Sequence, residues 1–213
     1  MKRICYIVGA APTAALPSPR EGDFLIAADR GYDALQRAGL APDLIMGDFD
    51  SLGYTPEGEN VLSHSPIKDD TDLILALRWA MARGWRRFVI HGALGGARLD
   101  QTVASFQTLR FLAEHGATGR LVGDGWNVTL LQNAALRFPE SASGWLSVFL
   151  SGDAARGVTL RGLKYTLADE ALSCDYPMGV SNEFQGTEAL VKVTDGSLFV
   201  LWQGEALPEE VSV

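Results

Sequence analysis

The pattern of hydrophobic and polar positions divides the chain into two regions with different periodicity. In the first region, short apolar runs of the buried-strand type alternate with segments whose apolar residues recur at helical spacing. The expected strands are residues 4–8, 24–28, 44–46, 88–90 and 121–122, and the expected helices are residues 32–38, a segment capped by Thr71, and residues 100–114. Strands separated by such helices predict an α/β domain with a mostly parallel, doubly wound sheet.

After residue 126 the pattern changes to short apolar runs separated by Gly, Asp and Ser. The expected strands there are residues 128–131, 145–150, 157–160, 189–193 and 197–202, with no long helical pattern between them. Such a series of strands with turn signals is typical of a small all-β sandwich or barrel. We therefore predict two domains, residues 1–126 and residues 127–213.

The composition is that of a globular protein, with 213 residues of which 47% are apolar. The 18 Lys and Arg against 26 Asp and Glu give a formal net charge of −8, which argues against a nucleic-acid partner held by a broad basic face. No apolar run approaches the ~18 residues of a membrane span, so we expect no membrane partner. The apolar run after Met1-Lys2-Arg3 is shorter than the roughly 7–15 residues of a signal peptide, which favours a cytoplasmic location.

Acidic residues gather where the expected strands end or the expected helices begin. They are Asp29, Asp48, Asp50, Asp70, Asp72 and Asp100. Ligands of open parallel sheets bind beyond the carboxyl ends of the strands, so these side chains are expected near one another. Two carboxylates about 4 Å apart repel by roughly 4 kcal/mol, and Mg²⁺, which prefers oxygen ligands, would relieve that repulsion. The alternative is that each Asp only caps a helix or shapes a turn.

A glycine-rich turn, residues 92–98, is the second candidate for ligand binding. Its glycines would let backbone N–H groups approach a phosphate, and Arg98 could add a bidentate contact. The turn matches neither the P-loop pattern nor the dinucleotide fingerprint. An ordinary tight turn therefore remains open.

Six motifs along the chain, taken in order, resemble those of the thiamine pyrophosphokinase (thiamine diphosphokinase) family. They are Ala28-Asp29-x-Gly31, Pro42-Asp43-Leu44-Ile45-Met46-Gly47-Asp48-Phe49-Asp50-Ser51, Lys68-Asp69-Asp70-Thr71-Asp72, Gly95-Gly96-Ala97-Arg98-Leu99-Asp100-Gln101, Gly162-Leu163-Lys164-Tyr165 and Ser181-Asn182-Glu183. The resemblance implies transfer of pyrophosphate from ATP to thiamine with Mg²⁺, giving thiamine diphosphate and AMP. It also implies a Rossmann-like first domain, a β-sandwich as the second domain and a homodimer with thiamine at the subunit interface.

On this resemblance we assign roles to individual residues. We predict that Asp48, Asp50 and Asp72 hold Mg²⁺, and that Asp100 is a further ligand or orients the attacking hydroxyl. The nucleotide contacts are expected from Thr71, Arg98 and Gln101, and the thiamine contacts from Ser181 and Asn182. Further candidates for the thiamine pocket are Tyr165, Glu183 and Trp202, and core packing explains Trp202 equally well.

Two other functions remain open. The same metal centre could serve a pyrophosphokinase that acts on another small alcohol, such as a hydroxymethylpterin. A non-catalytic regulator that binds the nucleotide or thiamine is the alternative from a different class, and it would require a broken metal site.

Overall fold

The computed structural model describes residues 3–65 and 70–212 of the chain. The chain divides into two compact units, Met1–Asp124 and Gly125–Val213, and the division falls two residues before the predicted domain boundary. No helix within the described residues is long and apolar enough to cross a membrane.

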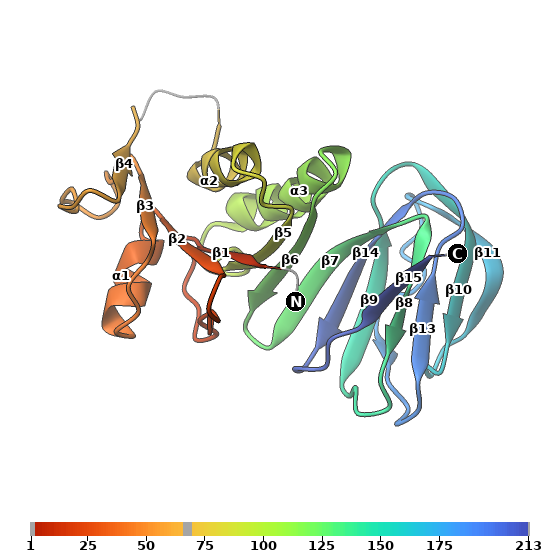
Figure 1. The fold of residues 1–213 in the computed structure, drawn as a ribbon. Helices are drawn as coiled ribbons and strands as arrows, with labels where there is room; N and C mark the ends of the chain where they lie inside the picture. The colour runs from red at the N-terminus through yellow and green to blue at the C-terminus, as the bar shows by residue number, and fades with distance from the viewer. Residues whose placement is uncertain (1–2, 66–69, 213) are drawn as a thin grey trace. The chain divides into compact units, whose positions relative to one another are not determined.

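The first unit is a parallel sheet flanked by helices. Its strands are β1 (Cys5–Val8), β2 (Phe24–Ala28), β3 (Leu44–Gly47), β4 (Val61–Ser63), β5 (Arg87–His91) and β6 (Thr118–Gly123). They lie in the order β6-β5-β1-β2-β3-β4, and each of these pairs is parallel. Helix α1 (Gly31–Arg37) covers one face, while α2 (Asp72–Ala82) and α3 (Leu99–Glu114) cover the other (Figure 1). The predicted α/β arrangement is therefore present in this unit.

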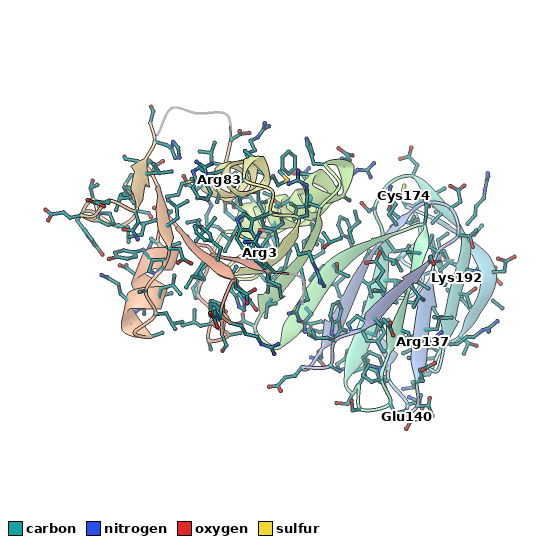
Figure 2. All side chains as sticks on the ribbon, in the orientation of Figure 1. Arg3, Arg83, Arg137, Glu140, Cys174 and Lys192 are labelled. Atoms are coloured by element: carbon teal, nitrogen blue, oxygen red, sulfur yellow. The ribbon has the colours of Figure 1, made fainter. Side chains whose placement is uncertain are left out.

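Helix α2 begins where its sequence predicts. Thr71 caps it, because the Thr71 hydroxyl oxygen accepts a hydrogen bond from the Ile74 backbone N–H at 3.2 Å. At the other end of the helix, Phe24 of β2 lies between Trp79 and Trp85, with ring centroids 5.7 and 5.8 Å apart. Arg83 covers Trp79 and Arg3 covers Trp85, and both arginines are labelled in Figure 2. These stacked groups fix the helix against the amino ends of the strands.

The strand order reverses between β1 and β5, which are neighbours in the sheet although the chain runs through β2, β3 and β4 between them. The segments that leave these two strands touch through their backbones. A methyl group added at Gly9 would lie 2.7 Å from the Gly92 carbonyl oxygen, and one at Gly92 would lie 2.4 Å from that of Gly9. Glycine is therefore required on both sides of this crossing, where open α/β sheets bind their ligands.

The second unit is made of strands alone within the described residues. The strands are β7 (Trp126–Gln132), β8 (Ala134–Phe138), β9 (Trp145–Leu150), β10 (Ala154–Arg161), β11 (Leu167–Ser173), β12 (Asn182–Glu183), β13 (Ala189–Lys192), β14 (Ser197–Gln203) and β15 (Glu209–Ser212). They pair antiparallel in the orders β12-β9-β14-β7 and β11-β10-β13-β8-β15. Apolar residues from both sets of strands share one core, in which the Phe138 and Trp202 rings are 5.5 Å apart, so the unit is a sandwich.

Candidate functional site

Three aspartates of the first unit come together at the carboxyl ends of neighbouring strands. Asp29 directly follows β2, and its backbone N–H donates to the Met46 carbonyl of β3 at 2.8 Å. Asp48 directly follows β3, and Asp50 lies two residues further along. Each of the three offers a carboxylate oxygen, and these oxygens all lie within 4.8 Å of one another. The sequence expectation of converging carboxylates is met here by Asp29, Asp48 and Asp50.

An unusual turn brings Asp48 and Asp50 to the same side of the chain. The residue between them, Phe49, has a left-handed backbone (φ 61°) although it carries a large side chain. That side chain is 3% exposed and packs with Leu25, Leu35 and other core residues, which holds the turn in place. As a result the Asp50 backbone N–H donates to the Asp48 carboxylate at 3.2 Å. Core packing thus stabilises a strained backbone at the candidate site.

The hydrogen bonds of the three carboxylates fit a divalent cation. Asp29 is 9% exposed; its Oδ2 accepts from the Ser51 hydroxyl, while its Oδ1 is buried and has no hydrogen-bond partner within the described residues. The hydrogen bond between the Asp50 and Asp48 side chains, together with the negative charge of Asp48, raises the pKa of the Asp50 carboxyl above its ordinary value. A buried acceptor without a donor and crowded negative charges are both costly. Mg²⁺ would satisfy the Asp29 oxygen and neutralise the cluster, so these residues fit that ion.

The predicted ligand Asp72 is the first residue of α2. Asp72 is not part of the three-carboxylate group among the described residues, and its role as a ligand stays a prediction. The neighbouring Thr71 uses its hydroxyl oxygen to cap the helix, and Asp70 forms a 3.1 Å ion pair with Arg78. The motif residues Lys68 and Asp69 lie outside the described residues.

Arg98, Asp100 and Gln101 lie together where α3 begins, as their spacing predicts. Arg98 donates two hydrogen bonds to the Asp100 carboxylate in a fork, from Nε to Oδ1 at 2.9 Å and from Nη2 to Oδ2 at 2.5 Å. This fork lowers the pKa of Asp100 to about 2 and raises that of Arg98. Both side chains are well exposed, and Gln101 is exposed beside them. In this structure, therefore, Arg98, which is expected to bind phosphate, is paired with Asp100, the expected catalytic carboxylate.

The predicted thiamine contacts in the second unit differ from one another in exposure. Asn182 is 1% exposed: its Oδ1 accepts from the backbone N–H groups of Tyr165 (2.9 Å) and Glu183 (3.0 Å), and its Nδ2 donates to the Tyr165 carbonyl (2.7 Å). Ser181 is exposed, with a left-handed backbone (φ 58°) and its N–H bonded to the Ser147 hydroxyl. Asn182 thus joins two turns, and its role toward thiamine stays a prediction.

The other candidates for a thiamine pocket have clear structural positions. Trp202 is 1% exposed in the core and donates its indole N–H to the Ala206 carbonyl, so core packing explains it. Tyr165 is 59% exposed, and Glu183 forms a 2.8 Å ion pair with Lys164.

Asp29 is a candidate metal ligand that the assignment from the sequence did not include. Two signals pointed to it: its place directly after an expected strand and its occurrence in the first family motif. What the sequence did not provide was the adjacency of β2 and β3, which sets the distance between Asp29 and Asp48.

Comparison with known proteins decides the family of the chain. Residues 20–118 match the family model of the thiamin pyrophosphokinase catalytic domain, and residues 133–198 match that of the thiamin pyrophosphokinase vitamin B1 binding domain. The chain belongs to the thiamin pyrophosphokinase family. The resemblance predicted from the motifs and the prediction of an enzyme of this family are thereby confirmed. The three clustered aspartates lie within the match to the catalytic domain, and Ser181 and Asn182 lie within the match to the vitamin B1 binding domain.

Individual members of the thiamin pyrophosphokinase family agree with this result over nearly their full length. The chain is 26% identical to the thiamine pyrophosphokinase of Bacillus subtilis (strain 168) over 214 residues, covering 92% of this chain and 96% of that protein. The crystal structure of the Bacillus subtilis thiamine pyrophosphokinase shares the fold, with a TM-score of 0.81 at 23% identity, covering 95% and 99% of the two chains. A thiamin pyrophosphokinase family protein from Enterococcus faecalis has a TM-score of 0.80 at 26% identity, covering 94% and 99%.

Proposed function

We propose that this protein transfers the pyrophosphoryl group of ATP to thiamine in a Mg²⁺-dependent reaction that yields thiamine diphosphate and AMP. The observation that supports this proposal most directly is the cluster of Asp29, Asp48 and Asp50 with the unsatisfied oxygen of Asp29. The cluster lies at the carboxyl edge of the parallel sheet, within the part of the chain that matches the catalytic domain.

The clustered carboxylates of the first unit would hold the metal ion, with Asp72 of α2 as a further ligand. When bound, Mg²⁺ supplies charge neutralisation for the triphosphate and for the transition state. Arg98 contacts the phosphates, which requires that it leave its fork with Asp100. Asp100 is then available to orient the thiamine hydroxyl, whose oxygen attacks the β-phosphorus and loses its proton to solvent. The bond between the β-phosphorus and the oxygen that bridges to the α-phosphate breaks, and AMP leaves with that oxygen. Thr71 and Gln101 complete the nucleotide site.

The thiamine site, the homodimer and the cytoplasmic location expected from the sequence belong to the same proposal. Ser181 and Asn182 shape the turn that receives thiamine, within residues 127–213. Exposed apolar side chains support a subunit interface: Trp145 (43%) and Phe149 (39%) on β9, and Leu99 (75%) and Val103 (56%) on the first turns of α3. Light scattering should give about twice the chain mass of 22.9 kDa, and a monomeric mass would contradict the dimer.

The test is an assay of the purified protein with ATP, Mg²⁺ and thiamine, in which both products are identified. We expect AMP and thiamine diphosphate in equal amounts, and no product when EDTA removes the metal. A parallel reaction replaces thiamine by a hydroxymethylpterin. Pyrophosphorylation of the pterin but not of thiamine would replace this proposal by the alternative acceptor, and nucleotide binding without any transfer would favour a regulator.

A further inference from the structure

Three buried side-chain atoms lack a hydrogen-bond partner within the described residues, and all three lie at the carboxyl ends of strands in the first unit. They are Asp29 Oδ1 after β2, His64 Nε2 after β4 and His91 Nε2 at the end of β5. The first belongs to the candidate cation site. Of the two histidines, His91 is the more buried, with 6% of its surface exposed, and no step of the proposed reaction uses it.

The other ring nitrogen of His91 is firmly engaged. His91 Nδ1 lies 2.6 Å from the carbonyl oxygen of Ala15, which can only accept, so Nδ1 carries the proton and Nε2 is an acceptor. Burial lowers the pKa of His91 to about 4, so the ring is neutral near pH 7. An apolar side chain in this position would remove the unpaired Nε2 of His91, but it would also take from the Ala15 carbonyl the N–H that His91 donates to it. The bond to Ala15 is therefore the physical reason for a histidine here.

Ala15 belongs to the segment that leaves β1, residues 9–16, which we call the β1 loop. The β1 loop is attached at several points to β5 and to the glycine-rich turn that follows it. The Gly9 N–H donates to the His91 carbonyl at 2.8 Å, and the Ala11 N–H donates to the Gly92 carbonyl at 2.9 Å. At the far end of the β1 loop, Leu16 packs against the core cluster that holds Phe49. The loop thus connects the glycine-rich turn with the base of the aspartate cluster.

We propose that His91 is a positioning residue of the nucleotide site, because it fixes the β1 loop as the wall of that site through the carbonyl of Ala15. The β1 loop and the glycine-rich turn meet where the strand order reverses, which is the ligand-binding crevice of open α/β sheets. Two further glycines of the turn, Gly95 and Gly96, have left-handed backbones and permit close approach to phosphate. The match to the catalytic-domain model begins at residue 20, so the β1 loop lies outside it. The inference rests on the proposed function, since it concerns the site that binds ATP.

The test compares two substitutions at His91 with one control. His91→Leu keeps a buried side chain but removes the donor to Ala15, whereas His91→Asn places an amide N–H near the position of Nδ1. We expect His91→Leu to raise the KM for ATP by about fivefold or more, the effect of one lost hydrogen bond, with the KM for thiamine unchanged. His91→Asn should restore most of the affinity for ATP. The control is His115→Leu, because His115 Nδ1 also bonds a carbonyl (Phe111, 2.7 Å) but at the end of α3; it should change neither KM.

Hydrogen exchange separates this inference from the proposed function. In His91→Leu the amides of Gly9 and Ala11 should exchange faster than in the unchanged protein, and ATP affinity, measured by calorimetry, should fall whether or not the protein transfers pyrophosphate. Absence of transfer by the unchanged protein would therefore overturn the proposed function while the role of His91 is still measured. Faster exchange without loss of ATP affinity would overturn the inference. So would an equal rise of both KM values, which indicates a general folding defect.

Discussion

The two units use the polar atoms of their candidate residues in opposite ways. In the first unit, Asp29 has a buried oxygen that receives no hydrogen bond from the part of the chain that the structure describes, and the charges of Asp48 and Asp50 lie beside it. In the second unit, Asn182 is almost completely buried, and the two polar atoms of its side chain form three hydrogen bonds with the backbone. The aspartate cluster is thus organised at a cost to stability and suits a ligand, whereas the Asn182 turn is organised for rigidity.

Both regions contain left-handed residues that are not glycine, but different interactions hold them. In the first unit Phe49 is fixed by burial of its own side chain in the core. In the second unit Ser181 is exposed, and the buried neighbour Asn182 fixes the turn instead. A substitution that removes a negative charge from the aspartate cluster should therefore stabilise the metal-free protein and strongly reduce pyrophosphate transfer. A substitution that removes the hydrogen bonds of Asn182 should instead lower the stability of the second unit.

The largest expected effect follows from Asp50→Asn, which keeps the shape of the side chain and removes its charge. If the cluster holds Mg²⁺, kcat should fall by about 10²-fold or more, as for the loss of an electrostatic catalyst. Without Mg²⁺ the same variant should melt at a higher temperature than the unchanged protein, because the repulsion by Asp48 is gone. Steady-state kinetics and thermal melting in EDTA measure the two effects.

The pH dependence of melting provides the control for this prediction. The hydrogen bond between the Asp50 and Asp48 side chains is the main reason that the pKa of Asp50 is raised in the folded protein. Between the unfolded and the folded pKa, the folded state therefore holds a proton that the unfolded state has already lost. That contribution to stability is present at low pH and is lost as the pH rises through the raised pKa. In EDTA the melting temperature should show this decline in the unchanged protein but not in Asp50→Asn. A lower melting temperature for Asp50→Asn at pH 7 in EDTA would contradict the cluster as described.

A smaller effect, on stability rather than catalysis, is expected from Asn182→Ala. Loss of three buried hydrogen bonds should lower the free energy of unfolding of the second unit by about 2–4 kcal/mol. The KM for thiamine should rise as the turn loosens, while the KM for ATP stays unchanged. Urea denaturation followed by tryptophan fluorescence and the two KM values test this. Unchanged stability would show that the bonds of Asn182 are replaced easily and would remove the contrast between the two units.

The sequence predicted the fold of the first unit better than that of the second. Helical spacing and buried apolar runs are strong signals in α/β units, and they located β1, β2, β3, β5 and β6 with α1, α2 and α3, but not the short β4. Several strands of the second unit have weak signals. Strand β11 contains Leu, Ala and Glu residues that favour helix, and it is a strand because it pairs with β10. Strand β15 begins with two glutamates and shows no apolar run.

The sequence predicted that the candidate site is a cluster of carboxylates, but it did not predict which aspartates form the cluster. The position of carboxylates at strand ends is a property of the sequence, and it correctly placed Asp48 and Asp50 beside each other. Whether Asp29 or Asp72 joins them depends on which strands are neighbours and where α2 begins, and these are tertiary properties. Similarly, the sequence could not show that the Asn182 side chain points inward while Ser181 stays exposed.

The smallest expected effect concerns Ser181, and it asks whether the rigid turn of the second unit contacts thiamine at all. Glycine adopts the left-handed backbone of Ser181 without strain, so Ser181→Gly should stabilise the second unit by at most about 1 kcal/mol, whereas Ser181→Ala should not. Both variants lack the hydroxyl. If that hydroxyl binds thiamine, both should raise the KM for thiamine to the same extent, by roughly fivefold for one hydrogen bond, with the KM for ATP unchanged. A normal KM for thiamine in both variants would instead mean that the exposed hydroxyl makes no contact, and the turn would then be structural in both of its residues.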